Sequence, residues 1–234
     1  MRVAAMAGRE KGGLYNTGRG LEDRHGTGDY PVILGFKDRD DFLRWIDGEV
    51  VIDLGSGYGT LAKAVEEAKL HKEVRPETRI LSVNQALQDK TFLKRTHQST
   101  RSALGLQGRR MPRFLNEQHD ASMLAAHWSE LQNIPSGSVG KIVSCKSFPL
   151  YCQSPEELYA VMKESFRILK DGGEMRCSDP KHNAIVERGK NSRDIFLEFT
   201  QLIGDLGFQK QERCGFDQYE NKVQVWSLIK PIHR

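Results

Sequence analysis

The sequence predicts an α/β fold in which helices cover both faces of a mostly parallel sheet. Short apolar segments with strand character alternate with longer segments whose apolar residues recur at helical spacing. A turn with three glycines joins an early strand to the helix that follows it. The last two strand segments are joined by a short loop. We therefore expect one antiparallel strand near the C-terminus, because a parallel crossover needs about a dozen residues or more.

The first half of the chain alternates helix and strand. Apolar residues at helical spacing before Asp47 and Gly48 indicate a helix over residues 37–46. Mostly apolar segments indicate strands at 49–54, where the apolar run ends in an acidic residue, and at 79–83. The remaining segments of this half are interpreted as helices at 61–70, 85–104 and 121–131 and a short strand at 114–117.

Turn, start and stop signals define the second half. A turn at residues 135–138 precedes a strand at 141–145. Ser154 is suited to cap a helix whose first residue is Pro155, and the glycines within residues 171–173 are suited to end it. The later segments indicate a strand at 174–179, a helix at 191–206 and strands at 207–214 and 222–230.

The N-terminal region differs in composition from the rest. Residues 1–36 are rich in glycine and arginine, so they cannot form a core alone. We expect a flexible arm or lid there, with a disordered tail as the alternative, and a single domain over residues 37–234. The side chains of the arm that are suited to cover a ligand are Tyr15, Arg19, Arg24 and His25.

The composition is that of an ordinary globular protein. The 234 residues are 38% hydrophobic and 28% charged, with a formal net charge of +4. No apolar run approaches the roughly 20 residues that cross a bilayer, and the first residues lack a signal peptide's apolar region, so we expect a cytoplasmic protein without a membrane span. The cysteines show no metal-ligand spacing, so we expect reduced thiols, mostly in the core, and no metal. They are Cys145, Cys152, Cys177 and Cys214.

The most informative segment is V-I-D-L-G-S-G-Y-G at residues 51–59. Its glycines allow a sharp turn and a close approach of the backbone to a ligand at the carboxyl end of the strand. The spacing is G-x-G-x-G rather than the G-x-G-x-x-G of dinucleotide-binding proteins, which disfavours NAD. Asp53 would repel a pyrophosphate but can bind an ammonium group. This combination favours a zwitterionic cofactor without phosphate.

Three segments in order resemble the class I S-adenosylmethionine-dependent methyltransferases, particularly the branch of the ubiquinone and menaquinone methyltransferases. They are the glycine turn, I-P-S-G-S-V-G-K-I-V-S-C at 134–145 and F-R-I-L-K-D-G-G-E-M at 166–175. The resemblance runs from about residue 42 to 229. It implies a Rossmann-like, seven-stranded sheet, the cofactor S-adenosylmethionine and the product S-adenosylhomocysteine.

The resemblance also implies roles for individual residues. Asp53 and the turn would hold the amino acid part of the cofactor, Asn84 and Gln85 its ribose, and Asp120 with the next backbone N–H its adenine. Asn84 departs from the family, which has a carboxylate there because two hydroxyl donors match a bidentate acceptor. The implied cofactor residues are Asp53, Leu54, Gly55, Ser56, Gly57, Gly59, Asn84, Gln85, Asp120, Ala121 and Cys145.

The acceptor is expected above the end of the fourth strand. Phe148 and Tyr151 can line that space, and Tyr151 or His182 is a candidate general base. Each of the two candidates has a surface or packing role as its alternative. Methyl transfer from a sulfonium needs mainly alignment and exclusion of water, so few catalytic residues are required. We expect a small-molecule acceptor.

Two other functions stay open on the sequence alone. A basic stretch over residues 90–113 suits RNA, although a solvated helix face and loop is the interpretation that the small net charge favours. A non-catalytic binding module is suggested by Asn84 and by Gly140, which stands where the family has aspartate. Cofactor binding and RNA binding distinguish these three functions.

Overall fold

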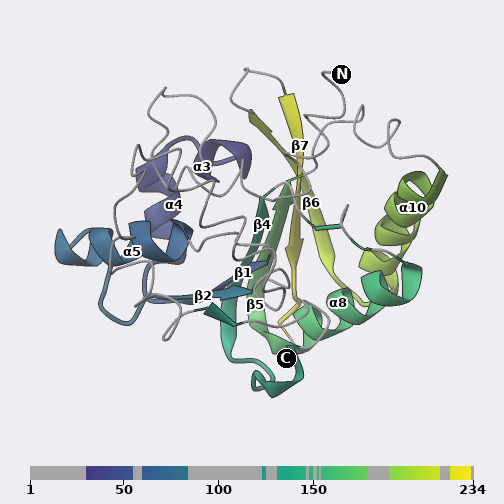
Figure 1. Ribbon diagram of the computed structural model, residues 1–234, viewed down its shortest axis with the longest axis horizontal. Helices are drawn as coiled ribbons and strands as arrows, with labels where there is room; N and C mark the ends of the chain where they lie inside the picture. Colours follow the sequence, from purple (N-terminus) through teal and green to yellow (C-terminus); the bar gives the residue numbers. More distant parts are fainter. Residues whose placement is uncertain are drawn as a thin grey trace, which may run out of the picture.

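The computed structural model describes residues 30–54, 60–83, 123–124, 131–145, 148–149, 152, 154–178, 190–216 and 222–232 (Figure 1). These residues form one mixed sheet with helices beside it. In chain order the elements are α3 (Tyr30–Ile33), α4 (Arg39–Ile46), β1 (Val50–Leu54), α5 (Thr60–Leu70), β2 (Arg79–Val83), β3 (Met123–Leu124), the 3₁₀ helix η2 (Leu131–Asn133), β4 (Val139–Cys145), α8 (Pro155–Ile168), β5 (Leu169–Ser178), α10 (Lys190–Asp205), β6 (Gln209–Phe216) and β7 (Lys222–Ile229).

The strands are arranged in the order β3-β2-β1-β4-β5-β7-β6. Neighbours from β3 to β5 pair in parallel, whereas β7 runs antiparallel to both β5 and β6. The predicted mixed α/β sheet with an antiparallel strand near the C-terminus is therefore confirmed. Asp53 of β1 is aligned with Ser82 of β2 and with Val143 of β4, which brings the carboxyl ends of these strands to one edge.

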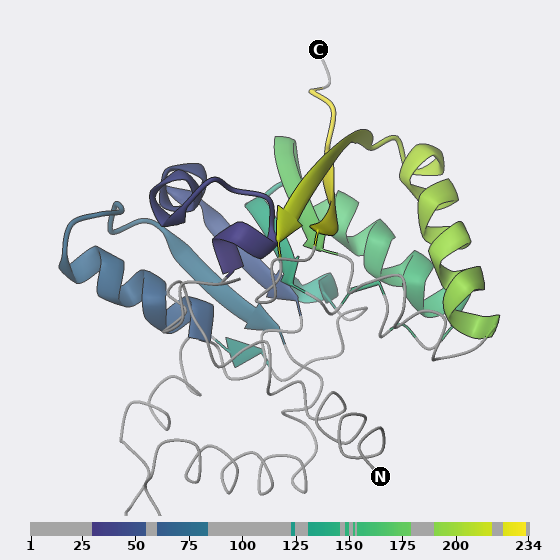
Figure 2. The same ribbon diagram turned by 90° about the horizontal axis from the view of Figure 1, so that it is seen from above.

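Helices cover both faces of the sheet, as expected (Figures 1 and 2). On one face, α4 and α5 pack with β-strand residues such as Val51 and Val143. On the other face, α8 and α10 pack with residues such as Ile52 and Ile142. Alternate residues of a strand point to opposite faces, so β1 contributes to both cores and its end is buried on both sides. The burial of β1 explains why its residues before Asp53 are all apolar.

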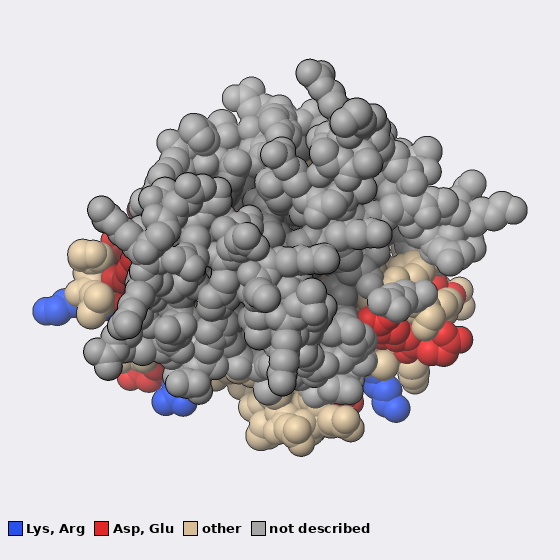
Figure 3. Space-filling model, viewed as in Figure 1, with Lys and Arg blue, Asp and Glu red and all other residues tan. Residues whose placement is uncertain are grey.

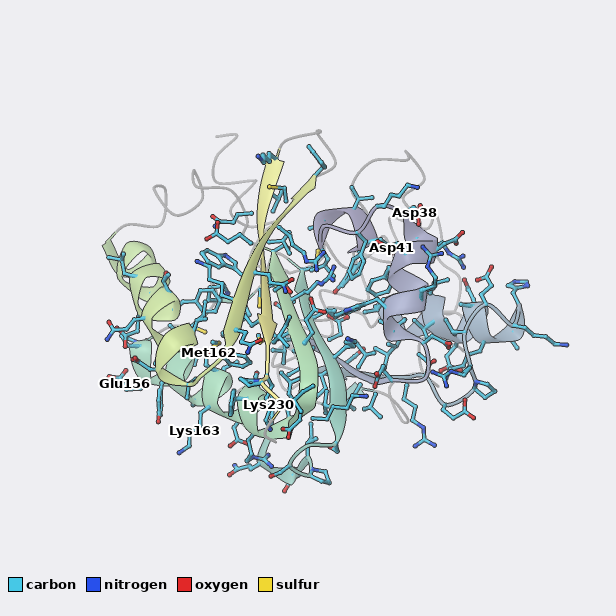
Figure 4. The ribbon with its side chains drawn as sticks, turned by 180° about the vertical axis from the view of Figure 1, so that it is seen from behind. Asp38, Asp41, Glu156, Met162, Lys163 and Lys230 are labelled. Atoms are coloured by element: carbon cyan, nitrogen blue, oxygen red, sulfur yellow. The ribbon has the colours of Figure 1, made fainter. Side chains whose placement is uncertain are left out.

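Two helix starts are capped by side chains, and that of α8 follows the start signal identified in the sequence. The Asp38 side chain accepts a hydrogen bond from the Asp41 backbone N–H at 2.8 Å, and the Ser154 hydroxyl accepts one from the Glu157 N–H at 3.2 Å. Each thereby satisfies one of the backbone donors that a helix start leaves free. Within α8, Met162 faces the sheet, whereas Glu156 and Lys163 point away from it (Figure 4).

The boundary between α8 and β5 differs from the prediction. The helix ends at Ile168, and β5 already begins at Leu169, which is paired with Val139. The glycines expected to end the helix lie inside the strand, where the Gly172 N–H donates to the Lys230 carbonyl at 2.9 Å. Hydrogen bonds with Lys230, just after the C-terminal strand β7, thus hold residues 172–173 within β5.

The third strand also differs from the prediction. The strand beside β2 is Met123–Leu124, which lies inside the stretch expected to be helical, so that part of the prediction is wrong. Two residues are too few for a strand periodicity to be recognised. The strand expected at 114–117 and the helix expected at 85–104 lie outside the described residues.

The boundary of the N-terminal arm needs correction as well. Residues 30–36 were expected to belong to a flexible arm, but Tyr30, Ile33, Leu34 and Phe36 are buried in the core beside α4. They form an apolar run whose partners are distant in the sequence, which composition alone does not reveal. Residues 1–29, with the proposed lid side chains, lie outside the described residues.

The cysteines behave as the sequence predicts. All four are free, and Cys145, Cys152 and Cys177 are buried whereas Cys214 is exposed. Among the described residues no group of three or more His, Cys, Asp or Glu side chains is arranged to hold a metal ion. No helix in the described ranges has both the length and the apolar character needed to cross a bilayer.

Gly140 has a packing explanation. A Cβ at this position would overlap the side chain of Glu49, which lies against the glycine and forms an ion pair with Lys170 at 2.7 Å. Gly140 sits at the amino-terminal end of β4, five residues before the strand ends. The missing aspartate of the family pattern therefore concerns the entrance of the strand, not the edge where a cofactor is expected.

We expect the substitution Gly140→Asp to lower the free energy of unfolding by about 1–3 kcal/mol, because it crowds Glu49 and places a second carboxylate beside it. Urea denaturation measures the loss. In a Glu49→Ala background the loss should be much smaller. An equal loss in both backgrounds would contradict this explanation of Gly140.

Candidate functional site

The carboxyl end of β1 places Asp53 in a fully buried position. Its Oδ1 atom accepts a hydrogen bond from the Tyr30 hydroxyl at 2.8 Å. Its Oδ2 atom is buried and has no hydrogen-bond partner in the described part of the chain. A buried carboxylate oxygen without a donor is costly, so this arrangement is suited to receive a donor from a ligand.

The surroundings of Asp53 alter its ionisation. Burial raises the pKa of Asp53 to about 7, although the hydrogen bond from Tyr30 acts in the opposite direction. The pKa of Tyr30 is also raised, chiefly by burial and further by the nearby Asp53 and Cys145. Tyr30 therefore keeps its proton and remains a donor, while Asp53 changes charge near neutral pH.

A second buried polar atom lies on the neighbouring strand. Ser82 is the register partner of Asp53 and is fully buried, and its Oγ atom likewise has no partner among the described residues. Side chains at paired positions of neighbouring strands lie on the same face of a sheet. β1 and β2 thus present, at adjacent positions, two side chains that each have one buried polar atom without a partner among the described residues.

Ser144 fixes the backbone on the other side of β1. Its hydroxyl lies 3.2 Å from the Leu54 carbonyl oxygen, to which it donates, and it accepts from the Phe148 N–H at 2.9 Å. These contacts join the last residue of β1 to the turn that follows β4. Because Ser144 is fully buried, the relative positions of the two strand ends are well defined.

A buried polar cluster holds α4 against the sheet near this site. Glu174 accepts from Arg176 Nε at 2.6 Å, from the Ser227 hydroxyl at 2.5 Å and from Trp45 Nε1 at 2.7 Å. The Arg176 guanidinium carbon also lies 3.9 Å from the ring centre of Phe36. The cluster joins α4 and the segment before it to β5 and β7.

Three of the predicted cofactor residues are described, and they lie at the expected edge. Asp53 and Leu54 end β1, and Cys145 ends β4 on the neighbouring strand. Phe148, expected to line the acceptor space, instead lies in the core, where its ring packs edge-on against Phe199 at 5.7 Å between centres. The expectation for Phe148 is wrong because its backbone is drawn inward by Ser144.

The other predicted site residues lie outside the described residues. They are Gly55, Ser56, Gly57, Gly59, Asn84, Gln85, Asp120, Ala121, Tyr151, His182 and the basic segment 90–113. On the face seen in Figure 3, the described charged residues at the sides include both acidic and basic ones.

Two residues of the site were missed by sequence reasoning. Tyr30 was assigned to the arm, although the apolar run that follows it, P-V-I-L-G-F, is a signal for burial. Ser82 was read only as part of a strand, and its position beside Asp53 depends on the strand register. Neither position can be inferred from local sequence, because Tyr30 and Ser82 lie 23 and 29 residues away from Asp53.

Comparison with known proteins adds information on the fold. No family model and no curated protein matches this sequence. Among solved structures, a methyltransferase dependent on S-adenosylmethionine from Archaeoglobus fulgidus is similar, with a TM-score of 0.52 and 10% identity, covering 81% of this chain and 90% of that one. A chain in the complex of the Haloferax volcanii Trm112 methyltransferase activator with the putative methyltransferase has a TM-score of 0.50 and 16% identity, covering 80% and 84%.

The chain therefore has the fold of the S-adenosylmethionine-dependent methyltransferases. This agrees with the class I resemblance derived from the three sequence segments. The narrower resemblance, to the ubiquinone and menaquinone branch, remains a prediction. The site offers an acceptor that fits the ammonium group of S-adenosylmethionine, since one buried oxygen of Asp53 has no partner among the described residues.

The raised pKa of Asp53 has a consequence for stability. Between pH 5 and pH 8 the folded protein gives up a proton that the unfolded chain, with a carboxyl pKa near 3.8, has already lost. Because the folded state binds more protons in this window, stability falls as pH rises, by about 3 kcal/mol for this group. Urea denaturation at both pH values measures the change.

The variant Asp53→Asn is the control, because it cannot ionise. The difference in unfolding free energy between Asp53→Asn and the wild type should shift by about 3 kcal/mol in favour of the variant from pH 5 to pH 8. A difference that is the same at both pH values would show that Asp53 has an ordinary pKa.

Proposed function

We propose that this protein is an S-adenosylmethionine-dependent methyltransferase that transfers a methyl group to a small-molecule acceptor. The observation that carries the proposal is Asp53. It is a buried carboxyl at the carboxyl end of β1, two residues before the first glycine of the G-x-G-x-G turn, and one of its oxygens has no partner among the described residues. A carboxylate in this position is suited to an ammonium group and unsuited to a phosphate.

The proposed roles of the other residues follow the family resemblance. Backbone N–H groups of residues 55–59 contact the amino acid part of the cofactor, and Asn84 with Gln85 contacts its ribose. Asp120 accepts from the adenine amino group, with Ala121 beside it. The ends of β1 and β4, at Leu54 and Cys145, form the wall of the site next to these groups, and the contact of Ser144 with Leu54 supports this wall.

The cofactor supplies a methyl group on a cationic sulfur that is already activated. The protein's contribution is to hold the acceptor in line with that methyl group and to exclude water. Where the acceptor is a hydroxyl or an amine, a base is required, and Tyr151 and His182 are our candidates. Both are proposed on their positions in the sequence, after the fourth and fifth strands.

The two alternative functions are less well supported. RNA binding depends on residues 90–113, and the formal net charge of +4 gives little long-range attraction to a polyanion. The argument for a non-catalytic module depended partly on Gly140. The packing of Glu49 against Gly140 supplies a structural reason for that glycine, so its presence does not indicate a lost activity.

Isothermal titration calorimetry with S-adenosylhomocysteine tests the proposal. The wild type should bind it in the low micromolar range or tighter and should not bind NAD. Asp53→Ala should weaken binding about 30-fold or more, because one partner of a buried charge pair is lost. Glu49→Gln is the matched control, since it removes an acidic residue at the opposite end of β1 and should leave the affinity unchanged.

The acceptor is identified in a second step, by screening small molecules and RNA for methylation with radiolabelled cofactor. Binding of NAD in place of S-adenosylhomocysteine, or no binding of either, would contradict the proposed function. Binding without methylation of any acceptor would favour the non-catalytic module.

A further inference from the structure

We propose that Tyr30 is a positioning residue for the cofactor: its hydroxyl holds one oxygen of Asp53 so that the other remains available for the cofactor's ammonium group. The segment 30–36 then acts as a clasp that makes cofactor affinity depend on an element outside the sheet. This inference rests on the proposed function. Tyr30 itself acts through Asp53.

The geometry of the hydrogen bond supports this role. The Tyr30 hydroxyl is 2.8 Å from Asp53 Oδ1, and the tyrosine is only 3% exposed. A hydrogen bond to one carboxylate oxygen restricts rotation of the group, so the position of Oδ2 is fixed as well. Oδ2 is buried and has no partner among the described residues, which is the state expected of an oxygen kept for a ligand.

The backbone around Tyr30 is held by a close contact with β6. A Cβ at Gly215 would overlap the carbonyl oxygens of Val32 and Ile33, so α3 lies directly on the β6 backbone. Gly35 has a φ of +75°, and a Cβ there would lie 3.0 Å from the Cys214 carbonyl oxygen. Two glycines therefore permit the approach that brings Tyr30 to Asp53.

This approach crosses most of the sheet. β6 is an end strand, and β7, β5 and β4 separate it from β1. The clasp thus contacts β6 at Gly215 and contacts β1 through the Tyr30 hydroxyl. The apolar side chains of Ile33 and Leu34 are buried on the way, which holds the segment on the sheet.

The groups that surround Asp53 make the Tyr30 hydroxyl important for the ionisation of Asp53. The titratable groups that face this position are Tyr30 from α3 and Cys145 from β4, with the hydroxyl of Ser82 beside them on β2. The buried residues of α5 are all apolar, namely Leu61, Ala62, Val65 and Ala68. No described cation contributes to the pKa of Asp53, so the Tyr30 hydroxyl is the group that favours its charged form.

Removal of the hydroxyl has two expected effects. Asp53 Oδ1 loses its hydrogen-bond donor, so the carboxyl group can rotate. The ligand must then donate to whichever oxygen faces it. The pKa of Asp53 rises further, because the hydrogen bond from Tyr30 that opposes the effect of burial is then lost. Binding of an ammonium group should therefore weaken and should require a higher pH.

The test is calorimetric titration of the full chain with S-adenosylhomocysteine from pH 6 to pH 8.5, comparing wild type with Tyr30→Phe. Wild-type affinity should rise with pH and level off above about 7. Tyr30→Phe should bind about tenfold more weakly at pH 7, and its affinity should level off at a higher pH. Tyr159→Phe is the matched control, because Tyr159 is 46% exposed on α8.

A second pair of variants tests the clasp without changing Tyr30. Gly215→Ala should displace α3 and weaken binding in the same direction as Tyr30→Phe. Gly204→Ala is its control, since a Cβ at Gly204 meets nothing within 4 Å. This pair also covers the case in which Tyr30→Phe does not fold, which circular dichroism would show.

The outcomes separate this inference from the proposed function. If the wild type binds normally and Tyr30→Phe has the same affinity and the same pH profile, the role of Tyr30 is wrong and the proposed function stands. If the wild type does not bind at all, the proposed function fails and the cofactor role of Tyr30 fails with it. Carbon NMR titration of the Asp53 carboxyl in both unliganded proteins then shows whether the hydrogen bond alone holds Asp53.

Discussion

The proposed function depends on a buried carboxyl group at the end of the central strand β1. Asp53 is fully buried, and the described protein satisfies only one of its two oxygens. A buried charge with one free oxygen lowers the stability of the unliganded protein above neutral pH, so a purely structural role would favour an apolar residue. The arrangement is reasonable if a ligand supplies the missing donor. This constraint connects the fold to the proposed binding of S-adenosylmethionine.

Contacts between elements far apart in the sequence hold Asp53 and the neighbouring strands in position. Tyr30 reaches Asp53 because α3 rests on the glycine of β6, and Ser144 joins the end of β1 to the turn after β4. The cluster around Glu174 holds α4 on the same face of the sheet. The contacts of Tyr30 and Ser144 fix groups near the carboxyl edge, where α/β sheets bind ligands. Glu174 lies further from this edge, since it is paired with Lys141 of β4. Binding geometry is therefore a property of the whole sheet and not of the glycine turn alone.

The sequence predicted features that depend on local signals. The Ser154 cap, the buried strand β1 and the antiparallel strand at the C-terminal end follow from residue types within a few positions of one another. Features that depend on distant partners were missed or misplaced. The end of α8 at Ile168 depends on strands β4 and β7, and β3 has too few residues to show a period. Tyr30 was assigned to the arm because its hydrogen-bond partner, Asp53, lies 23 residues later. Phe148 was expected to line the acceptor space because no neighbouring residue in the sequence indicates its packing against Phe199.

The most direct measurement is the number of protons released when S-adenosylhomocysteine binds, obtained by calorimetry in buffers of different ionisation enthalpy. If the ligand's ammonium group pairs with Asp53, the carboxyl must lose its proton on binding. With a pKa of about 7 for Asp53, release should be about 0.9 proton per ligand at pH 6 and close to zero at pH 8.5. Asp53→Asn should release none at either pH. Binding at pH 6 without proton release, or with the same release in Asp53→Asn, would contradict the account.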